Sequence, residues 1–303
     1  MVKNASARHI SEVGNYGDGR EYYASKYVME HAQPNDSDAV LKALEDFDVR
    51  WTMLHLGKEK GELLDRALKE FILERRRMKQ QTVSCVTSST TCCKKPNTPI
   101  RALEIGTYIG YSAIRIGRKL ATEADHGSTL LSVEQNYENA EYAKTHVEYA
   151  GLNKTVQVLH SRVEKYVDDE TSNNEVEVGI DGNENDNSLF PLYNYNRRPY
   201  DFVFIDHRKP FYLRHLKLLE SRGFIDATIT TVVADNIASL EHVKNREESI
   251  ARGKRKGPCK CVNNACDYLD YVRRRWSSTE IFYGNGTKDG ISVSKPSFIG
   301  GDN

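Results

Sequence analysis

Polar side chains that can hydrogen-bond a ligand or transfer a proton stand at the ends of two apolar segments. In "YDFVFIDHRK", the apolar run 202–205 leads directly into Asp206, and an imidazole and two cations follow at His207–Lys209. In "TTVVADN", a second apolar run ends in Asp235 and Asn236. Acids, imidazoles and amines are the side chains that proteins use for acid–base chemistry. These two segment ends are therefore the first candidates for a functional site.

A third candidate is the turn "ALEIGTYIGYS", which carries Gly106 and Gly110. A dinucleotide-binding fold has G-x-G-x-x-G here, so that the backbone can approach a pyrophosphate. Tyr108 stands where the second of those glycines would be, which favours a ligand without phosphates. Glu134 ends the next apolar segment, where an acid can accept hydrogen bonds from both ribose hydroxyls of an adenosine. A solvated acid is the alternative for Glu134, but the turn and the acids together indicate a site for S-adenosylmethionine (SAM).

The surrounding sequence predicts an α/β fold that would bring these residues to one edge. Helices are expected at about 21–33, 35–49, 61–79, 111–121, 137–151, 211–221 and 266–276, and strands at about 101–105, 128–134, 155–161, 200–206, 229–235, 278–284 and 290–296. Strands that alternate with helices predict a parallel sheet. Right-handed crossovers place the carboxyl ends of such strands on one edge, where ligands bind.

The composition is that of an ordinary globular protein. Its 303 residues include 43 basic and 43 acidic side chains, and this balance argues against a general nucleic-acid-binding role. No apolar run approaches the roughly 20 residues of a membrane helix, and the first residues lack the apolar core of a signal peptide. We therefore expect no membrane partner and a cytoplasmic location.

Three polar stretches read as loop inserts in a single domain that spans residues 1–303. They lie at about 80–98, 165–199 and 240–264, after N-terminal helices at about 20–79. The six cysteines fall in two groups of three, at 85, 92 and 93 and at 259, 261 and 266. Neither group has the paired C-x-x-C spacing of a zinc site, so free thiols in loops are expected, with a metal site or disulfides as the alternatives.

Several ordered blocks of the sequence resemble the catechol O-methyltransferase family. They are "ALEIGTYIGYSAIRIGRKL", "LLSVEQNYENAEYA", "HVEYAGLNKTVQVL", "YDFVFIDHRKPFYL" and "ADN", and "HAQPNDSDAVLKALEDF" with "WTMLHLGKEKG" resembles the N-terminal helices and cofactor-covering loop of that family. The resemblance implies a Rossmann-like, seven-stranded, mostly parallel sheet with helices on both faces. It also implies Mg²⁺-dependent transfer of a methyl group from SAM to a hydroxyl of a catechol.

The resemblance assigns a role to each strand-end residue. Asp206, Asp235 and Asn236 match the magnesium ligands, and carboxylate and amide oxygens are hard ligands of the kind that Mg²⁺ prefers. Lys209 matches the catalytic lysine, which would act as general base on a catechol hydroxyl. Lys209 and Asn236 would also contact the substrate. The residues that match the cofactor-binding positions of the family are Leu54, His55, Leu56, Glu104, Gly106, Tyr108, Ser112, Glu134, Gln135, Val163, Glu164, Asp206 and His207.

Two departures from the family concern the substrate. Arg208 stands where the mammalian enzymes have a tryptophan, and "FYGNGTKDGISVS" has no clear counterpart of a C-terminal glutamate that contacts the second catechol hydroxyl. Two alternatives therefore accompany the catechol prediction. One is a related O-methyltransferase that acts on another vicinal diol or phenol, such as a caffeoyl thioester. The other is a non-catalytic SAM-binding protein, which the intact set of metal and lysine positions argues against.

Overall fold

The computed structural model describes residues 16–84, 98–172, 198–237, 265–283 and 289–296, together with Glu248 and Arg252. The strands are β1 (Arg101–Ile105), β2 (Thr129–Glu134), β3 (Val156–His160), β4 (Phe202–Ile205), β5 (Thr231–Ile237), β6 (Ser278–Tyr283) and β7 (Gly290–Lys295). The helices are α1 (Arg20–His31), α2 (Ser37–Arg50), α3 (Lys58–Ser84), α4 (Tyr111–Glu123), α5 (Tyr137–Tyr149), α6 (Val163–Ser172), α7 (Tyr212–Ser221) and α9 (Ala265–Arg275), and a 3₁₀ turn, η1, spans Lys209–Phe211.

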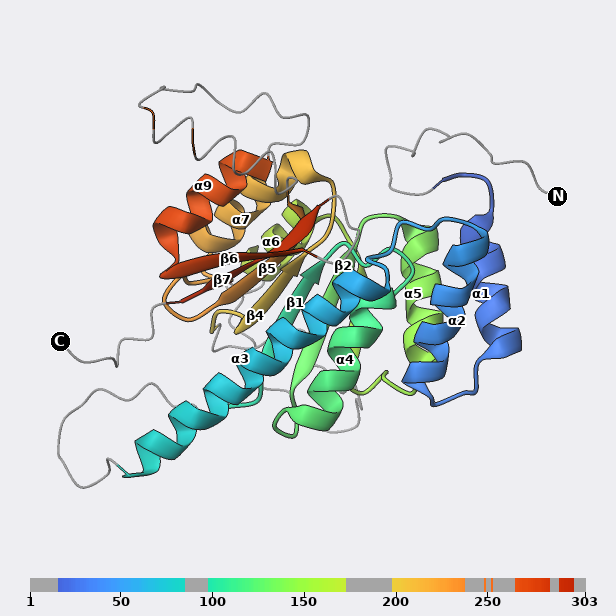
Figure 1. Cartoon of the computed structure of the whole chain (residues 1–303), viewed down its shortest axis with the longest axis horizontal. Helices are drawn as coiled ribbons and strands as arrows, with labels where there is room; N and C mark the ends of the chain where they lie inside the picture. The colour runs from blue at the N-terminus through green and yellow to red at the C-terminus, as the bar shows by residue number, and fades with distance from the viewer. Residues whose placement is uncertain are drawn as a thin grey trace.

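The seven strands form one sheet in the order β3-β2-β1-β4-β5-β7-β6. The first five are parallel to one another, whereas β7 runs antiparallel to both β5 and β6. The predicted fold, a seven-stranded and mostly parallel sheet with helices on both faces, is confirmed (Figure 1). The strand order reverses direction at β1 and β4, so the segments that follow these two strands meet at the edge where such sheets bind ligands.

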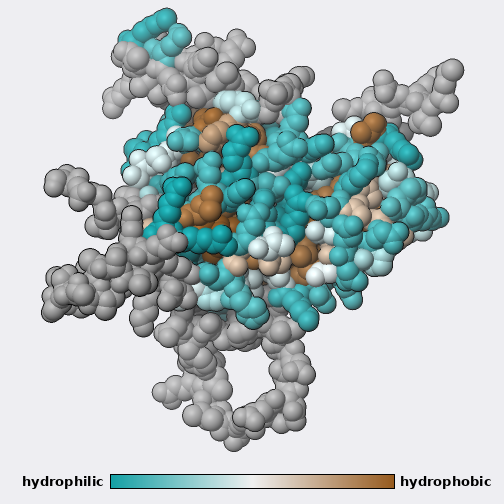
Figure 2. Space-filling view, turned by 60° about the horizontal axis from the view of Figure 1, so that its bottom comes forward, coloured by the Kyte–Doolittle hydropathy of each residue, from teal (hydrophilic) through white to brown (hydrophobic). Residues whose placement is uncertain are grey.

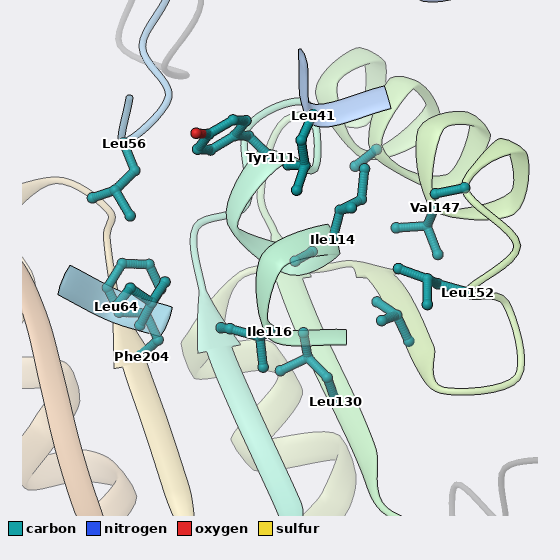
Figure 3. Close-up of a cluster of buried hydrophobic side chains, with 14 of the residues drawn as sticks. Leu41, Leu56, Leu64, Tyr111, Ile114, Ile116, Leu130, Val147, Leu152 and Phe204 are labelled. Carbon is teal, nitrogen blue, oxygen red and sulfur yellow. The ribbon is translucent and has the colours of Figure 1, made fainter. Parts of the chain in front are cut away.

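Alternate residues of the central strands pack into two separate hydrophobic layers. On one face, Phe202, Phe204 and Val233 pack with residues of α1 to α5. On the other face, Val203 and Ile205 pack with residues of α6, α7 and α9. Figure 3 shows part of the first layer, where Leu64 of α3 lies over Phe204 and Ile114 of α4 faces Val147 of α5, among other residues. Burial on both faces explains why the run 202–205 is continuously apolar.

One helix extends beyond its expected boundary, and another occupies a region where the sequence predicted no helix. Helix α3 continues to Ser84, past the expected start of the first insert at about residue 80. Helix α6 occupies part of the stretch expected as a second insert from about residue 165. Val163, Tyr166 and Val167 are spaced as one helical face and are buried against the sheet, which stabilises this helix. The remainder of the three inserts lies outside the described residues, except for the residues at 98 and 198–199 and for Glu248 and Arg252.

Cys266 is the one cysteine in the described part of the chain. It is buried at the beginning of α9 and does not lie in a loop, where the sequence predicted it. Within the described ranges no helix is long and apolar enough to cross a membrane. Figure 2 shows one face of the molecule, on which hydrophilic side chains predominate and apolar ones appear in small separate areas.

Candidate functional site

Asp206 and Lys209 lie directly after β4, next to the turn that follows β1. Gly106 has φ of 84°, and a Cβ atom on it would lie 2.3 Å from the carbonyl oxygen of Asp206. The backbone N–H of Asp206 donates to the carbonyl of Ile105 (2.9 Å), which holds the two segment ends together. Gly106 is thus required by a close approach between two backbones. Lys209 begins η1, and its side chain is near enough to Asp206 to influence that carboxyl electrostatically.

Asp235 and Asn236 form an irregularity in β5. Ala234 pairs with Ser292 and Ile237 pairs with Gly290, so two residues of β5 stand opposite the single residue Ile291 of β7. This is the residue count of a β-bulge, a feature that redirects side chains next to functional sites. Asn236 has φ of 52°, in the left-handed region that asparagine tolerates better than most residues. The bulge brings two consecutive polar side chains to the edge of the sheet.

Two residues that the sequence did not single out, Lys60 and Asp289, complete this cluster. Lys60 lies in the first turn of α3, and its Nζ is 2.7 Å from Oδ2 of Asp235 and 3.3 Å from Oδ1 of Asp289. The Nδ2 of Asn236 donates to Oδ2 of Asp289 (3.0 Å). Lys60 is 175 residues from Asp235 in the sequence, and no local pattern indicates the contact. The only sequence signal that could have indicated Lys60 is that "GKEKG" lies within the block that resembles the family.

The charges of this cluster influence one another. Burial, followed by the negative charge of Asp235, raises the pKa of the Asp206 carboxyl well above its ordinary value. Burial also raises the pKa of Asp235, against the opposite effect of the Lys60 ammonium. Burial lowers the pKa of Lys60, but the neighbouring carboxylates, Asp235 foremost, raise it above the ordinary value, so Lys60 is an ammonium at neutral pH. Two crowded carboxylates are a setting in which a further cation is stabilising.

The donor atoms present fit a hard divalent cation. Oδ1 of Asp235 has no hydrogen-bond partner among the described residues. It is buried, since the side chain of Asp235 is only 2% exposed. Asp206 and the amide oxygen of Asn236 would complete a set of two carboxylates and one amide, which suits Mg²⁺. No group of three or more His, Cys, Asp or Glu side chains with metal-binding geometry occurs in the described ranges. The predicted ligand set contains only two residues of these types, Asp206 and Asp235, because its third member is the amide of Asn236.

The glycine turn packs closely against α5, and Glu134 closes it from β2. Gly110 has φ of 94°, and a Cβ atom there would lie 3.1 Å from Cα of Ala143. Oε2 of Glu134 accepts the backbone N–H groups of Thr107 (3.2 Å) and Tyr108 (3.0 Å), and Oε1 accepts that of Asn136 (2.8 Å). The backbone N–H of Gln135 also acts on this carboxylate and lowers its pKa. Burial raises the pKa of Glu134 despite these hydrogen bonds.

The other predicted cofactor residues of the turn are buried around it. Glu104 is fully buried in β1, and its Oε2 accepts the hydroxyl of Ser132. Burial raises the pKa of Glu104 to about 7, against the opposite effect of the Ser112 and Ser132 hydroxyls. Tyr108 has φ of 52°, and its hydroxyl donates to Glu21 of α1 (2.7 Å). Helix α1 is therefore tied directly to the turn.

Leu54, His55 and Leu56 lie in the loop between α2 and α3. Leu56 is buried and Leu54 partly buried in the first hydrophobic layer. The His55 ring stacks on Tyr111, at the start of α4, with 4.5 Å between ring centroids. Its Nδ1 accepts the backbone N–H of Gly57 (3.0 Å). The structure therefore places this loop against the helix that begins at the glycine turn.

The predicted adenosine-side residues divide into two groups. His207, His215 and Glu164 form a connected chain, with 2.7 Å from Nε2 of His207 to Nδ1 of His215 and 3.2 Å from Nε2 of His215 to Oε1 of Glu164. Val163 is buried in the second layer, whereas Gln135 is exposed after β2. His215, on α7, was not predicted, because its role depends on a contact between separate elements.

The comparisons with known proteins agree with this architecture. Residues 98–195 match the model of the O-methyltransferase family. A probable O-methyltransferase of Mycobacterium tuberculosis is 32% identical over 234 residues, which cover 77% of this chain and 79% of that protein. The catechol O-methyltransferase of Bos taurus is 28% identical, and the match covers 73% of this chain and 62% of the bovine protein.

The solved structures that resemble this chain have lower sequence identity. One of them is an O-methyltransferase of Streptomyces achromogenes involved in tomaymycin synthesis, solved in complex with SAM. It is 17% identical with a TM-score of 0.48, and the match covers 92% of this chain and 90% of the other. The relationship to the mycobacterial protein, over most of both chains, carries the assignment. The chain belongs to the O-methyltransferase family.

Proposed function

We propose that this O-methyltransferase transfers the methyl group of SAM to a hydroxyl of a catechol or a related vicinal diol, with Mg²⁺ as the metal cofactor. The observation that carries the proposal is the strand-end cluster, in which Asp206, Asp235 and Asn236 come together with a buried, unpartnered oxygen on Asp235. The similarity to the bovine and mouse catechol O-methyltransferases, at 28% and 25% identity, supports the substrate class.

Two neighbouring regions of the protein would bind the two substrates, one holding SAM and the other holding Mg²⁺ and the diol. Glu134 would accept a hydrogen bond from a ribose hydroxyl of SAM, and the turn around Gly106 would hold the cofactor beside Asp206. Asp206, Asp235 and Asn236 would hold Mg²⁺, which when bound orients a diol and lowers the pKa of its hydroxyl. Lys209, next to Asp206, would accept the hydroxyl proton. Much of the rate would come from holding two substrates in a reactive orientation.

Arg208 supports a second candidate within the same reaction class. It is exposed between the predicted ligands and the predicted base, and its guanidinium lies 5.8 Å from the centroid of Phe211. A cation at this position would favour a diol that carries an acidic group, such as a phenolic acid derivative. A neutral catechol would gain less from it.

Methyl transfer from labelled SAM to a panel of neutral and acidic diols, with and without Mg²⁺, tests both candidates. We expect Mg²⁺-dependent turnover of at least one vicinal diol and none of the matching monophenol. The variant Asp235→Asn should raise the Mg²⁺ requirement at least tenfold, with little change in the affinity for SAM. Arg208→Trp should shift the preference toward neutral catechols if Arg208 recognises an acid. Full turnover in the presence of a chelator would contradict the proposal.

A further inference from the structure

We infer that Asp289, together with Lys60, positions the metal ligands Asp235 and Asn236 so that each presents one free oxygen to the cation. The inference deepens the proposed function and rests on it. Neither Asp289 nor Lys60 would itself bind the metal. Each acts through a contact to a ligand, Asp289 on Asn236 and Lys60 on Asp235, and the two contact each other at 3.3 Å.

The amide of Asn236 has its orientation fixed by Asp289. A carboxylate only accepts hydrogen bonds, so the group of Asn236 that faces Oδ2 of Asp289 at 3.0 Å must be its NH₂. The carbonyl oxygen Oδ1 of Asn236 therefore points the other way. An asparagine can bind a cation only through that oxygen, because its NH₂ has no lone pair to offer. Asp289 thus selects the one orientation of Asn236 that is competent to bind a metal.

Lys60 has the corresponding effect on Asp235. Its ammonium lies 2.7 Å from Oδ2 of Asp235, whereas Oδ1 is buried and has no partner among the described residues. The ion pair is itself largely buried, with side-chain exposures of 12% for Lys60 and 2% for Asp235. One carboxylate oxygen is therefore occupied and the other is available. An ammonium so close to a metal site also opposes the binding of a cation, and the negative charge of Asp289 offsets that effect.

The register of the sheet places Asp289 beside the bulge. Gly290 pairs with Ile237, directly after the two bulged residues, and Asp289 directly precedes Gly290, with its Oδ2 3.0 Å from Nδ2 of Asn236. Gly290 must be a glycine, because a Cβ atom there would lie 2.4 Å from the carbonyl oxygen of Phe282 on β6. The residue that directly precedes the antiparallel strand β7 thus supports ligands that come from the parallel part of the sheet.

Binding of Mn²⁺, used as a paramagnetic probe for the divalent-cation site, tests this inference without any turnover. The free Mn²⁺ signal would be measured by electron paramagnetic resonance during titration of the full-length protein. We expect Asp289→Ala to weaken Mn²⁺ binding at least tenfold. Asp289→Asn should weaken it less, because the new amide oxygen can still accept the NH₂ of Asn236. Glu280→Gln, which removes an exposed charge from the adjacent strand β6, is the matched control and should stay within twofold of the parent.

The outcomes separate this inference from the proposed function. Parent protein that binds Mn²⁺, with Asp289→Ala binding it equally well, would overturn the role of Asp289 and leave the proposed metal site intact. Parent protein that binds no Mn²⁺ would overturn the metal-dependent function and this inference with it. If Asp289→Ala does not fold, as judged by circular dichroism, Asp289→Leu decides, because leucine has a similar size and no acceptor, and an affinity within twofold of the Glu280→Gln control would overturn the inference. Partial rescue by Asp289→Asn at unchanged melting temperature supports a positioning role.

Discussion

Nε2 of His207 lies 2.7 Å from Nδ1 of His215, and this contact fixes which ring nitrogens carry hydrogen. His215 also faces Oε1 of Glu164 through its Nε2, and a carboxylate can only accept. His215 therefore donates through Nε2, and in its neutral form it accepts at Nδ1, so His207 donates through its own Nε2. Nδ1 of His207 then has no hydrogen, and it is buried without a partner in the described part of the chain.

We expect nuclear magnetic resonance to find both rings neutral, with hydrogen on Nε2, at pH 7. Burial lowers the pKa of both histidines, and the charge of His215 lowers that of His207 further, which keeps the rings neutral. Long-range ¹H–¹⁵N correlation spectra distinguish the tautomers directly. Glu164→Ala should remove the constraint and allow the second tautomer of His215 to appear. A doubly protonated His207 at pH 7, or hydrogen on its Nδ1, would contradict this assignment of the His207 and His215 tautomers.

Glu134→Ala should weaken SAM binding at least tenfold and also destabilise the fold. The structure supplies the second effect, because the side chain accepts three backbone N–H groups, including those of Thr107 and Tyr108. A charge-assisted hydrogen bond contributes roughly 1.5–3 kcal/mol, and a buried donor left unsatisfied costs a comparable amount. Isothermal calorimetry would give the affinity and chemical denaturation the stability.

The variant Glu134→Gln separates the effect on stability from the effect on SAM binding. It keeps one carbonyl oxygen for the N–H groups of the turn and should therefore recover part of the stability. SAM affinity should stay low, because the charged acceptor is gone. If both variants bind SAM as tightly as the parent, Glu134 is a structural residue of the turn and does not contact the cofactor.

The sequence predicted the sheet and the strand-end residues because both depend on local patterns. Continuous apolar runs followed by polar residues marked β4 and β5, and the parallel topology then brought Asp206 and Asp235 to the same edge. Asp36, directly before α2, accepts the backbone N–H groups of Asp38 and Ala39 with its side chain, a local contact of the same kind. Each of these features depends on only a few consecutive residues, so it can be predicted without knowledge of the long-range contacts.

The supporting residues could not be predicted, because they depend on long-range contacts. Lys60 is in a lysine-rich helix start, where a solvated cation is the ordinary interpretation, and Asp289 precedes an unremarkable strand. Their contact to each other spans 229 residues. The bulge at Asp235 and Asn236 depends on the register between β5 and β7, which the sequence of either strand alone does not specify.

Glu104 should make the stability of the protein fall as the pH rises from about 4.5 to about 7. Its pKa is raised from 4.5 to about 7 in the folded protein, mainly by burial. In that window the unfolded chain ionises and the folded chain does not, so the unfolded state gains stability relative to the folded state. A shift of this size corresponds to a contribution on the order of 3 kcal/mol. Glu104→Gln should lose this pH dependence, and equal slopes of stability against pH in parent and variant would contradict the prediction.

Lys209→Ala should reduce turnover by about 10²–10⁴, the usual contribution of a positioned general base. SAM and Mg²⁺ should bind as before, because Lys209 is not among the proposed ligands. The defect should shrink as the pH rises, since more of the diol then ionises without help. Lys165→Ala is the matched control, because Lys165 is an exposed lysine on α6. A lysine that served only as a surface cation would give almost no loss at any pH. Near-normal turnover of Lys209→Ala at neutral pH, in a variant that still binds Mg²⁺, would therefore refute the proposed base even if methyl transfer to a diol were confirmed.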